Sequence, residues 1–189
     1  MPWNQYVLGY HGCDAAVVKR VINGEEPLKP SENEYDWLGH GQYFWEENPG
    51  RAMAWAEESA RLKASAIQRP AILGAVINLG RCLNLTNSGS LELVSQGYAH
   101  LQNTLRATGK PMPTNVGKGH RMRRLDCAVI ETIHKVNIDQ KLPAFDTVRA
   151  FFIEGEPLYP KAGFRRLDHV QICVRNPQMI EGYFLPRIK

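Results

Sequence analysis

Residues 35–45, YDWLGHGQYFW, decide the fold together with residues 10–13, YHGC. Each segment places a histidine next to a glycine, with aromatic side chains close by. A glycine has no side chain, so its backbone can pass close to a ligand. Either segment alone is compatible with an ordinary turn, so the interpretation depends on the occurrence of both segments in this order.

The chain around the first segment has a simple pattern. Residues 5–10, QYVLGY, alternate with aromatic and β-branched side chains, and they predict a first strand that the His-Gly pair at 11–12 terminates. Asp14 predicts the N-cap of a helix over 15–23, because apolar residues recur there at helical spacing. The polar connection 24–40 has the length of a functional loop.

The second segment ends in a predicted strand over 42–45, followed by Asn48 as an N-cap and a helix to about Ser65. Apolar patterning predicts strands over 71–79, 147–153, 170–174 and 179–184, and helices over 91–105 and 125–135. Strands interleaved with helices, without a regular βαβ alternation, favour the α+β class. A length of 189 residues suits a single domain over 1–189.

Composition narrows the functional classes. The chain has no apolar run near the ~18 residues that span a bilayer, and it does not begin with a basic segment followed by an apolar one. We therefore expect a cytoplasmic protein that does not enter a membrane. The cysteines lie far apart without a C-x-x-C pair, which argues against a disulfide framework and predicts no metal site; they are Cys13, Cys82, Cys127 and Cys173.

The net charge of +4 is unevenly distributed. Between Arg106 and Arg124 the chain carries six lysines and arginines and no acidic residue. Glycines and prolines interrupt this segment and predict a mobile loop. Such a cluster can attract phosphate groups or can simply be a solvated loop, and both interpretations stay open.

A strand with His-Gly, a loop, Gly-x-Gly-x-Tyr-Phe at 39–44 and a helix of small and aromatic residues at 51–56 together resemble the ADP-ribosyltransferase superfamily. The similarity is to the branch that contains diphtheria toxin and the poly(ADP-ribose) polymerases, and to bacterial toxin-like members. It covers about residues 11–56. The resemblance implies an ADP-ribosyltransferase-like split β-sandwich with flanking helices, and NAD as the substrate.

The signature of this branch is a histidine, a tyrosine and a glutamate on three strands, and the resemblance assigns the first two to His11 and Tyr43. His11 would form a hydrogen bond with the adenosine-side ribose, and Tyr43 would stack on the nicotinamide ring. Gly12 would bring its backbone to the nicotinamide carboxamide, and Gly41 would let the loop pass close to the ligand. Trp55 is a second stacking candidate, one residue away from the family position, and is equally compatible with a core role.

The third signature position falls on Gln171, where the family has glutamate. Glutamine keeps a hydrogen bond to the nicotinamide ribose but carries no charge and cannot act as a general base. This departure argues against polymer formation. It leaves transfer of a single ADP-ribose unit, or NAD binding without catalysis. Two acids that precede the loop into this strand, Glu154 and Glu156, could compensate.

In related transferases the loop before the third strand contacts the acceptor. Here that loop carries Phe164, Arg165 and Arg166, a combination that suits stacking on an unpaired base while neutralising phosphates. It also suits contact with a protein surface. His169 lies two residues before Gln171 and so points to the same face of the strand, where it could contact the acceptor or be a buried histidine.

The resemblance thus implies a mono-ADP-ribosyltransferase that modifies a macromolecule. The basic segment and the loop favour nucleic acid, RNA or DNA, over protein as the acceptor. A bacterial toxin or phage-defence effector is the corresponding role, with a neutralising antitoxin expected by analogy. Two alternatives remain: a non-catalytic module that binds NAD or ADP-ribose, and an NAD glycohydrolase that uses water as the acceptor.

Overall fold

A computed structural model describes residues 5–117 and 122–187. Along the chain, the elements are β1 (Tyr6–Asp14), α1 (Ala15–Ile22), β2 (Gln42–Glu46), α2 (Pro49–Ala60), β3 (Pro70–Asn78), β4 (Cys82–Asn84), α3 (Ser88–Ala107), α4 (Arg124–Asp139), β5 (Thr147–Phe152), β6 (His169–Val174), a 3-10 turn (Pro177–Met179) and β7 (Ile180–Phe184). Within the described residues no helix has both the length and the apolar character needed to cross a membrane.

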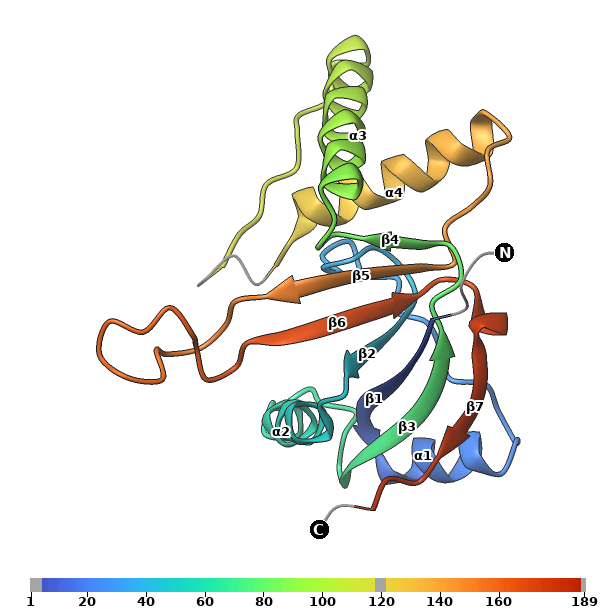
Figure 1. The fold of residues 1–189 in the computed structure, drawn as a ribbon, viewed down its shortest axis with the longest axis vertical. Coiled ribbons are helices and arrows are strands. Elements are labelled where there is room, and N and C mark those ends of the chain that lie inside the picture. Colours follow the sequence, from blue (N-terminus) through green and yellow to red (C-terminus); the bar gives the residue numbers. More distant parts are fainter. Residues whose placement is uncertain (1–4, 118–121, 188–189) are drawn as a thin grey trace.

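The strands form a seven-stranded sheet in the order β4-β5-β6-β2-β1-β3-β7. Neighbouring strands are antiparallel except for β4 and β5, which are parallel. In Figure 1 β4, β5 and β6 run across the view, β1, β3 and β7 run along it, and β2 lies between the two groups. The mixed α+β class predicted from the sequence is confirmed.

The two groups of strands part between β1 and β2. The ladder from β1 to β3 is continuous from Tyr6 to Asp14, whereas the ladder from β1 to β2 holds only the pairs Gly9↔Glu46 and Tyr10↔Trp45. The prediction that the first strand stops at Tyr10 is therefore wrong, because pairing with β3 carries it four residues farther. His11 and Gly12 therefore lie inside β1, where they pair with β3 on one side but no longer pair with β2 on the other.

The helices next to this opening begin where the sequence predicts. The Asp14 carboxylate accepts a hydrogen bond from the backbone N–H of Ala16 at 2.8 Å, and Asn48 Oδ1 accepts one from Arg51 at 2.9 Å. Both are N-cap contacts that satisfy otherwise unpaired N–H groups. Helix α2 ends at Ala60 instead of Ser65, and Leu62 beyond its end is 67% exposed, so no buried face supports another turn.

Three apolar clusters hold the sheet. One lies under α1 and includes Leu73 and Phe44, one lies under α4 and includes Val148, and the third joins Trp45 of β2 to Ala52 of α2. Figure 1 shows α1 and α4 at opposite ends of the sheet. β2 and β6 lie between these two ends and form the floor of the candidate site.

The middle of the chain forms an αα arm. Helix α3 buries only Gly97 among its residues, and a side chain there would lie 2.6 Å from Ile133 of α4. The predicted mobile basic loop is partly wrong, because Arg106 belongs to α3 and Arg124 begins α4. Lys118 and Arg121 lie outside the described residues. The remaining basic residues, Lys110 and Arg123, lie in the connection between the helices.

Candidate functional site

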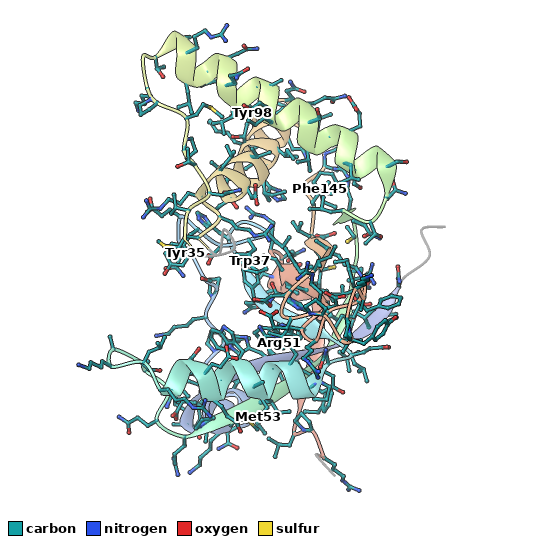
Figure 2. All side chains as sticks on the ribbon, turned by 90° about the vertical axis from the view of Figure 1, so that its left-hand side faces the viewer. Tyr35, Trp37, Arg51, Met53, Tyr98 and Phe145 are labelled. Carbon is teal, nitrogen blue, oxygen red and sulfur yellow. The ribbon has the colours of Figure 1, made fainter. Side chains whose placement is uncertain are left out.

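A cleft of about 680 Å³ opens where β1 and β2 part. Its walls are the loop 24–40 on one side and α2 on the other, and β2 and β6 contribute its floor. Six residues singled out from the sequence line it together: His11, Gly41, Tyr43, Trp55, Glu154 and Gln171. Figure 2 shows the loop side chains Tyr35 and Trp37 facing Arg51 of α2 across this region.

His11 has a defined protonation state at the end of the short β1–β2 ladder. Its Nδ1 lies 2.8 Å from the main-chain carbonyl oxygen of Tyr43. Because a carbonyl only accepts, Nδ1 carries the hydrogen, and Nε2 of the neutral ring is an acceptor. Burial lowers the pKa of His11 below its ordinary value of 6.5, against the weaker effect of this hydrogen bond. The ring therefore offers the cleft a lone pair rather than a positive charge.

Tyr43 joins the floor of the cleft to its wall. Its hydroxyl donates to the carbonyl oxygen of Gly39 at 2.6 Å and accepts from the N–H of Leu38 at 2.8 Å. Burial raises the pKa of Tyr43 well above 10, so the phenol stays protonated. With both contacts made, the hydroxyl anchors the loop, and what remains for a ligand is the aromatic ring.

The loop wall is ordered by its own polar groups. Ser31 and Gly41 exchange two backbone hydrogen bonds, of 2.8 and 3.0 Å. The Asp36 carboxylate accepts from the Ser31 hydroxyl at 3.0 Å and from the Asn33 N–H at 2.9 Å. A side chain at Gly41 would lie 2.6 Å from Cys173 Sγ, so glycine here lets the loop approach β6. The predicted long functional loop is thus a closed structure with one face on the cleft.

Gln171 lies on β6 directly opposite Trp45 of β2, and Trp45 in turn pairs with Tyr10 of β1. His11, Tyr43 and Gln171 therefore come from three neighbouring strands. By strand alternation Tyr43, Trp45 and Gln171 present their side chains to the same face of the sheet. His11, which follows Tyr10 in β1, packs near Phe44 at a ring-centroid distance of 5.9 Å and lines the cleft at its edge.

Gly12 does not line the cleft. A side chain at Gly12 would lie 2.3 Å from the main-chain oxygen of Ala52 and 3.2 Å from Trp55 Cε3. The absence of a side chain is thus explained by the close packing of α2 against β1, and the sequence-based role of admitting a ligand needs correction. Trp55, 38% exposed, lies on this helix with its ring centroid 5.7 Å from that of Trp45, and it lines the cleft rather than the core.

An ion pair lies at the inner end of the cleft and was missed as a pair in the sequence. Arg51 Nη2 lies 3.0 Å from Glu154 Oε2, and both residues line the cleft. The Arg51 guanidinium also lies 5.7 Å from the Trp45 ring centroid. The sequence does give one indication that Arg51 lies at the cleft. Arg51 precedes Trp55 by four residues, so both side chains lie on the same face of the helix. No signal links two residues 103 positions apart in the sequence.

The predicted acceptor loop connects β5 to β6 and projects from the sheet in Figure 1. Phe164 is 67% exposed, and Arg165 and Arg166 are exposed beside it. His169 is different: it is buried, it stacks on Phe152 at a centroid distance of 5.6 Å, and its Nδ1 donates to the Leu167 carbonyl. His169 does not line the cleft, and its buried ring does not reach the surface that an acceptor would contact, so the sequence-based role of His169 in acceptor binding needs correction.

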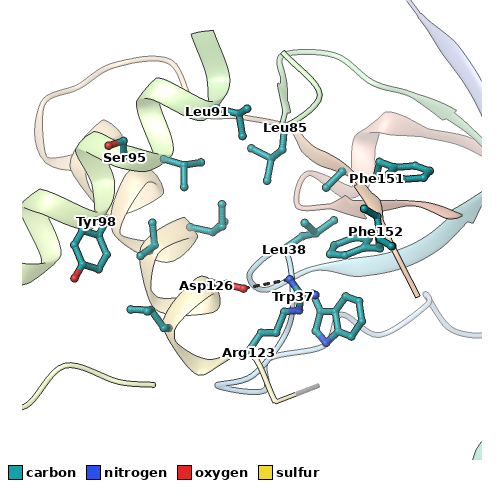
Figure 3. A pocket seen from close by; sticks show the side chains of 16 residues that line it. Trp37, Leu38, Leu85, Leu91, Ser95, Tyr98, Arg123, Asp126, Phe151 and Phe152 are labelled. Atoms are coloured by element: carbon teal, nitrogen blue, oxygen red, sulfur yellow. Dashed lines mark hydrogen bonds and ion pairs between the residues drawn. The ribbon is translucent and has the colours of Figure 1, made fainter. Parts of the chain in front are cut away.

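A second cavity, of about 570 Å³, lies between α3, α4 and β5 (Figure 3). Its lining is mostly aliphatic and aromatic, and Figure 3 shows one ion pair in it, Arg123 to Asp126 at 3.4 Å. The Arg123 guanidinium stacks on Trp37, 4.2 Å from its ring centroid. Because the first cleft combines a histidine, three acids, an arginine and stacking surfaces, it is the candidate site.

Within the described residues no three His, Cys, Asp or Glu side chains lie where they could hold a metal ion together. The four cysteines are free. Burial raises the pKa of Cys13 and of Cys127 to about 11, and that of Cys173 farther. These thiols stay protonated at neutral pH, so none of the three is poised as a nucleophile.

Comparison with known proteins gives one weak relationship. The chain is similar to an uncharacterized protein of Methanocaldococcus jannaschii, with 25% identity over 191 residues that cover 91% of this chain and 83% of the relative. No family model matches the chain. No solved structure matches it.

Proposed function

We propose that the protein is an NAD-dependent mono-ADP-ribosyltransferase that acts inside the cell on a macromolecule. The proposal is carried by one observation: His11, Tyr43 and Gln171, chosen from a sequence resemblance, line a single cleft from three neighbouring strands. A volume of about 680 Å³ lies within the range of roughly 300–1,000 Å³ that is usual for small-molecule sites.

NAD would lie with its nicotinamide ring against Tyr43 and its adenosine-side ribose at His11. The His11 Nε2 lone pair is able to accept a hydrogen bond from a ribose hydroxyl, because Nδ1 is held by the Tyr43 carbonyl. The Gln171 amide would bind the hydroxyl of the nicotinamide ribose. Trp55, at the rim, offers a second aromatic face. In an ADP-ribosyltransferase-like split β-sandwich, the parting of β1 and β2 would correspond to the split in the sheet.

In the reaction the bond between C1′ of the ribose and the nicotinamide nitrogen breaks, and nicotinamide leaves with the bonding pair. Positive charge develops on the ribose and the acceptor adds to C1′. Gln171 orients the ribose but cannot take a proton. Transfer of a single unit is therefore the activity that fits this residue, and chain elongation is not.

The acceptor that we favour is RNA or DNA. The loop before β6 exposes Phe164 next to Arg165 and Arg166, with Tyr159 and Lys161 also exposed. An aromatic ring beside cations binds an unpaired base and its phosphates. A protein acceptor is the competing possibility. A toxin or phage-defence role with a neutralising antitoxin would follow from damage to such an acceptor.

The test is mass spectrometry of cellular RNA, DNA and protein after brief expression, with a search for the mass of ADP-ribose. Modification of one class of molecule by the wild type, lost in Tyr43→Ala and kept in Tyr98→Ala, supports the proposal. Tyr98 is a matched control because it lies on α3, away from the cleft. Modification that survives Tyr43→Ala, or NAD binding that Tyr43→Ala does not weaken, would overturn it.

Position 171 holds glutamine where the resemblance predicts a glutamate carboxylate. This difference favours one other function, an NAD-binding module without catalysis. In that case calorimetry detects NAD binding while labelled NAD leaves no label on any molecule. A Gln171→Glu variant that gains transfer, beside a Gln171→Ala variant that does not, would show that only the charge is missing. Release of free ADP-ribose without any macromolecule would instead identify a glycohydrolase.

A further inference from the structure

Glu154 brings a carboxylate into the cleft from the end of β5. Its side chain is 15% exposed and that of Arg51 is 8% exposed, so the pair is largely withdrawn from water. Glu154 Oε2 lies 3.0 Å from Arg51 Nη2 and 3.8 Å from His169 Nδ1. The other acid near this point, Glu156, is exposed and does not line the cleft.

The backbone fixes Glu154 at the root of the acceptor loop. Its N–H donates to Asp168 Oδ1 at 3.0 Å, and its carbonyl accepts from the Leu167 N–H at 3.0 Å. The chain then turns sharply at Gly155, whose φ of 84° is in the left-handed region that favours glycine. The Glu154 side chain is thereby held between the loop that projects outward and the floor that carries Gln171.

The ion pair satisfies only part of the Arg51 guanidinium. Arg51 Nε and Nη1 are buried and have no hydrogen-bond partner among the described residues. A buried charge pair with unsatisfied donors is often no more stable than apolar residues of the same volume. Arg51 does orient Glu154, because its guanidinium binds the Oε2 atom of the carboxylate at 3.0 Å beside the cleft that both residues line.

We infer that Glu154 is the general base of the transfer reaction, with Arg51 as its positioning residue; this inference rests on the proposed function. Gln171 binds the nicotinamide ribose while Glu154, on the acceptor side, takes the proton. The bond from C1′ to nicotinamide breaks, and nicotinamide leaves as a neutral molecule. The acceptor oxygen or nitrogen forms its bond to C1′ and gives its proton to the Glu154 carboxylate, which returns it to water.

The experiment measures incorporation of label from NAD into the macromolecules of a cell lysate, with calorimetry of NAD binding in parallel. Glu154→Gln keeps the shape of the side chain, and we expect it to slow transfer by at least about 100-fold with NAD affinity unchanged within about threefold. Glu156→Gln, the same change two residues away, keeps wild-type transfer. Glu154→Asp, which retains the charge, keeps a measurable rate should the amide variant fold poorly.

The split between kcat and KM separates a base from a merely structural acid. Loss of a base lowers kcat and leaves the KM for NAD unchanged, whereas a disturbed cleft changes both. The charged or titratable side chains near Glu154 among the described residues are Arg51 from α2, His169 from β6 and Asp168 from the loop. Glu154→Gln removes the ion pair with Arg51, so Glu154→Asp, which keeps this charge, is measured beside it.

The outcomes distinguish the two proposals. Transfer by Glu154→Gln at a rate within threefold of a transferring wild type, or a loss that falls on the KM for NAD rather than on kcat, overturns the inference and leaves the proposed function standing. A wild type that neither binds NAD nor transfers label overturns the proposed function, and the role of Glu154 with it.

Discussion

The imidazole of His11 takes the place of a backbone hydrogen bond between two strands, because its Nδ1 lies 2.8 Å from the Tyr43 carbonyl oxygen just where the β1–β2 ladder ends. The strand carbonyl that the parting strands leave open is thereby satisfied by a side chain. The same contact fixes the ring tautomer and turns Nε2 into an acceptor.

A neutral His11 predicts that NAD affinity is nearly independent of pH from about 6.5 to 8, because the lowered pKa of His11 favours the uncharged imidazole in this range. His11→Ala removes the acceptor and frees the Tyr43 carbonyl, and we expect its dissociation constant for NAD to rise by about tenfold or more. Calorimetry at several pH values measures both. Wild-type affinity that falls steeply as the pH rises past 6.5 would mean that a charged imidazole binds the ligand.

The contact of β1 with α2 predicts a stability effect at Gly12. Gly12→Ala places a methyl group 2.3 Å from the Ala52 carbonyl oxygen, so the helix must move. We expect a loss of about 1–3 kcal/mol of unfolding free energy, measured by urea denaturation. Gly182→Ala is the matched control, since nothing lies within 4 Å of the added carbon; equal effects of the two changes would refute the explanation.

The exposed loop predicts salt-dependent binding to single-stranded RNA. Phe164→Ala should weaken binding by about 1–3 kcal/mol at any salt concentration, through loss of stacking. Arg166→Gln should reduce the slope of log affinity against log salt by about one. Fluorescence anisotropy with a short labelled RNA measures both. Lys19→Gln on α1, an exposed cation at the far end of the sheet, should change neither value.

His134 predicts acid sensitivity of the fold. Burial, helped by the charge of Arg175, lowers the pKa of His134 from 6.5 to about 4. Below pH 6.5 the unfolded chain takes up a proton that the folded chain refuses. The stability contribution is therefore complete above pH 6.5 and is lost as the pH falls toward 4, by about 2 kcal/mol at pH 5 from this residue alone. The lowered pKa values of His11 and His169 act in the same direction.

The test compares thermal unfolding of His134→Leu with that of the wild type from neutral pH to pH 5. His134 Nε2 has no hydrogen-bond partner, so an apolar replacement leaves no unsatisfied group behind. The variant should lose less stability than the wild type on acidification. His100→Leu, an exposed position on α3, should follow the wild type; a His134→Leu curve parallel to that of the wild type would contradict the prediction.

Local patterns predicted most of the elements, because caps and apolar spacing act within a few residues. The caps at Asp14 and Asn48 were identified correctly. Errors arose where distant pairing decides: β1 continues to Asp14 because β3 lies beside it, and the three-residue β4 is too short to produce a pattern. Helix α3 was underestimated because it buries little, so its sequence carries almost no apolar stripe.

The site was predictable to the extent that each residue carried its own signal. His11 and Tyr43 stood out through neighbouring glycines, and the structure brings both to one cleft. Glu154 was visible only as an acid before a loop, because its partner Arg51 lies on a helix that precedes it by about a hundred residues. Gly12 was predicted to contact a ligand, whereas the structure explains this glycine by the close packing of α2. In a sequence, a glycine required by a packed helix cannot be told from one required by a ligand.

The opening between β1 and β2 also bears on how the protein can change over evolutionary time. A recess formed by diverging strands keeps its depth as long as the sheet keeps its register, whatever the length of the segments at its mouth. Insertions in 24–40 or 153–168 would then alter what enters the recess, and the strand geometry beneath would be inherited unchanged.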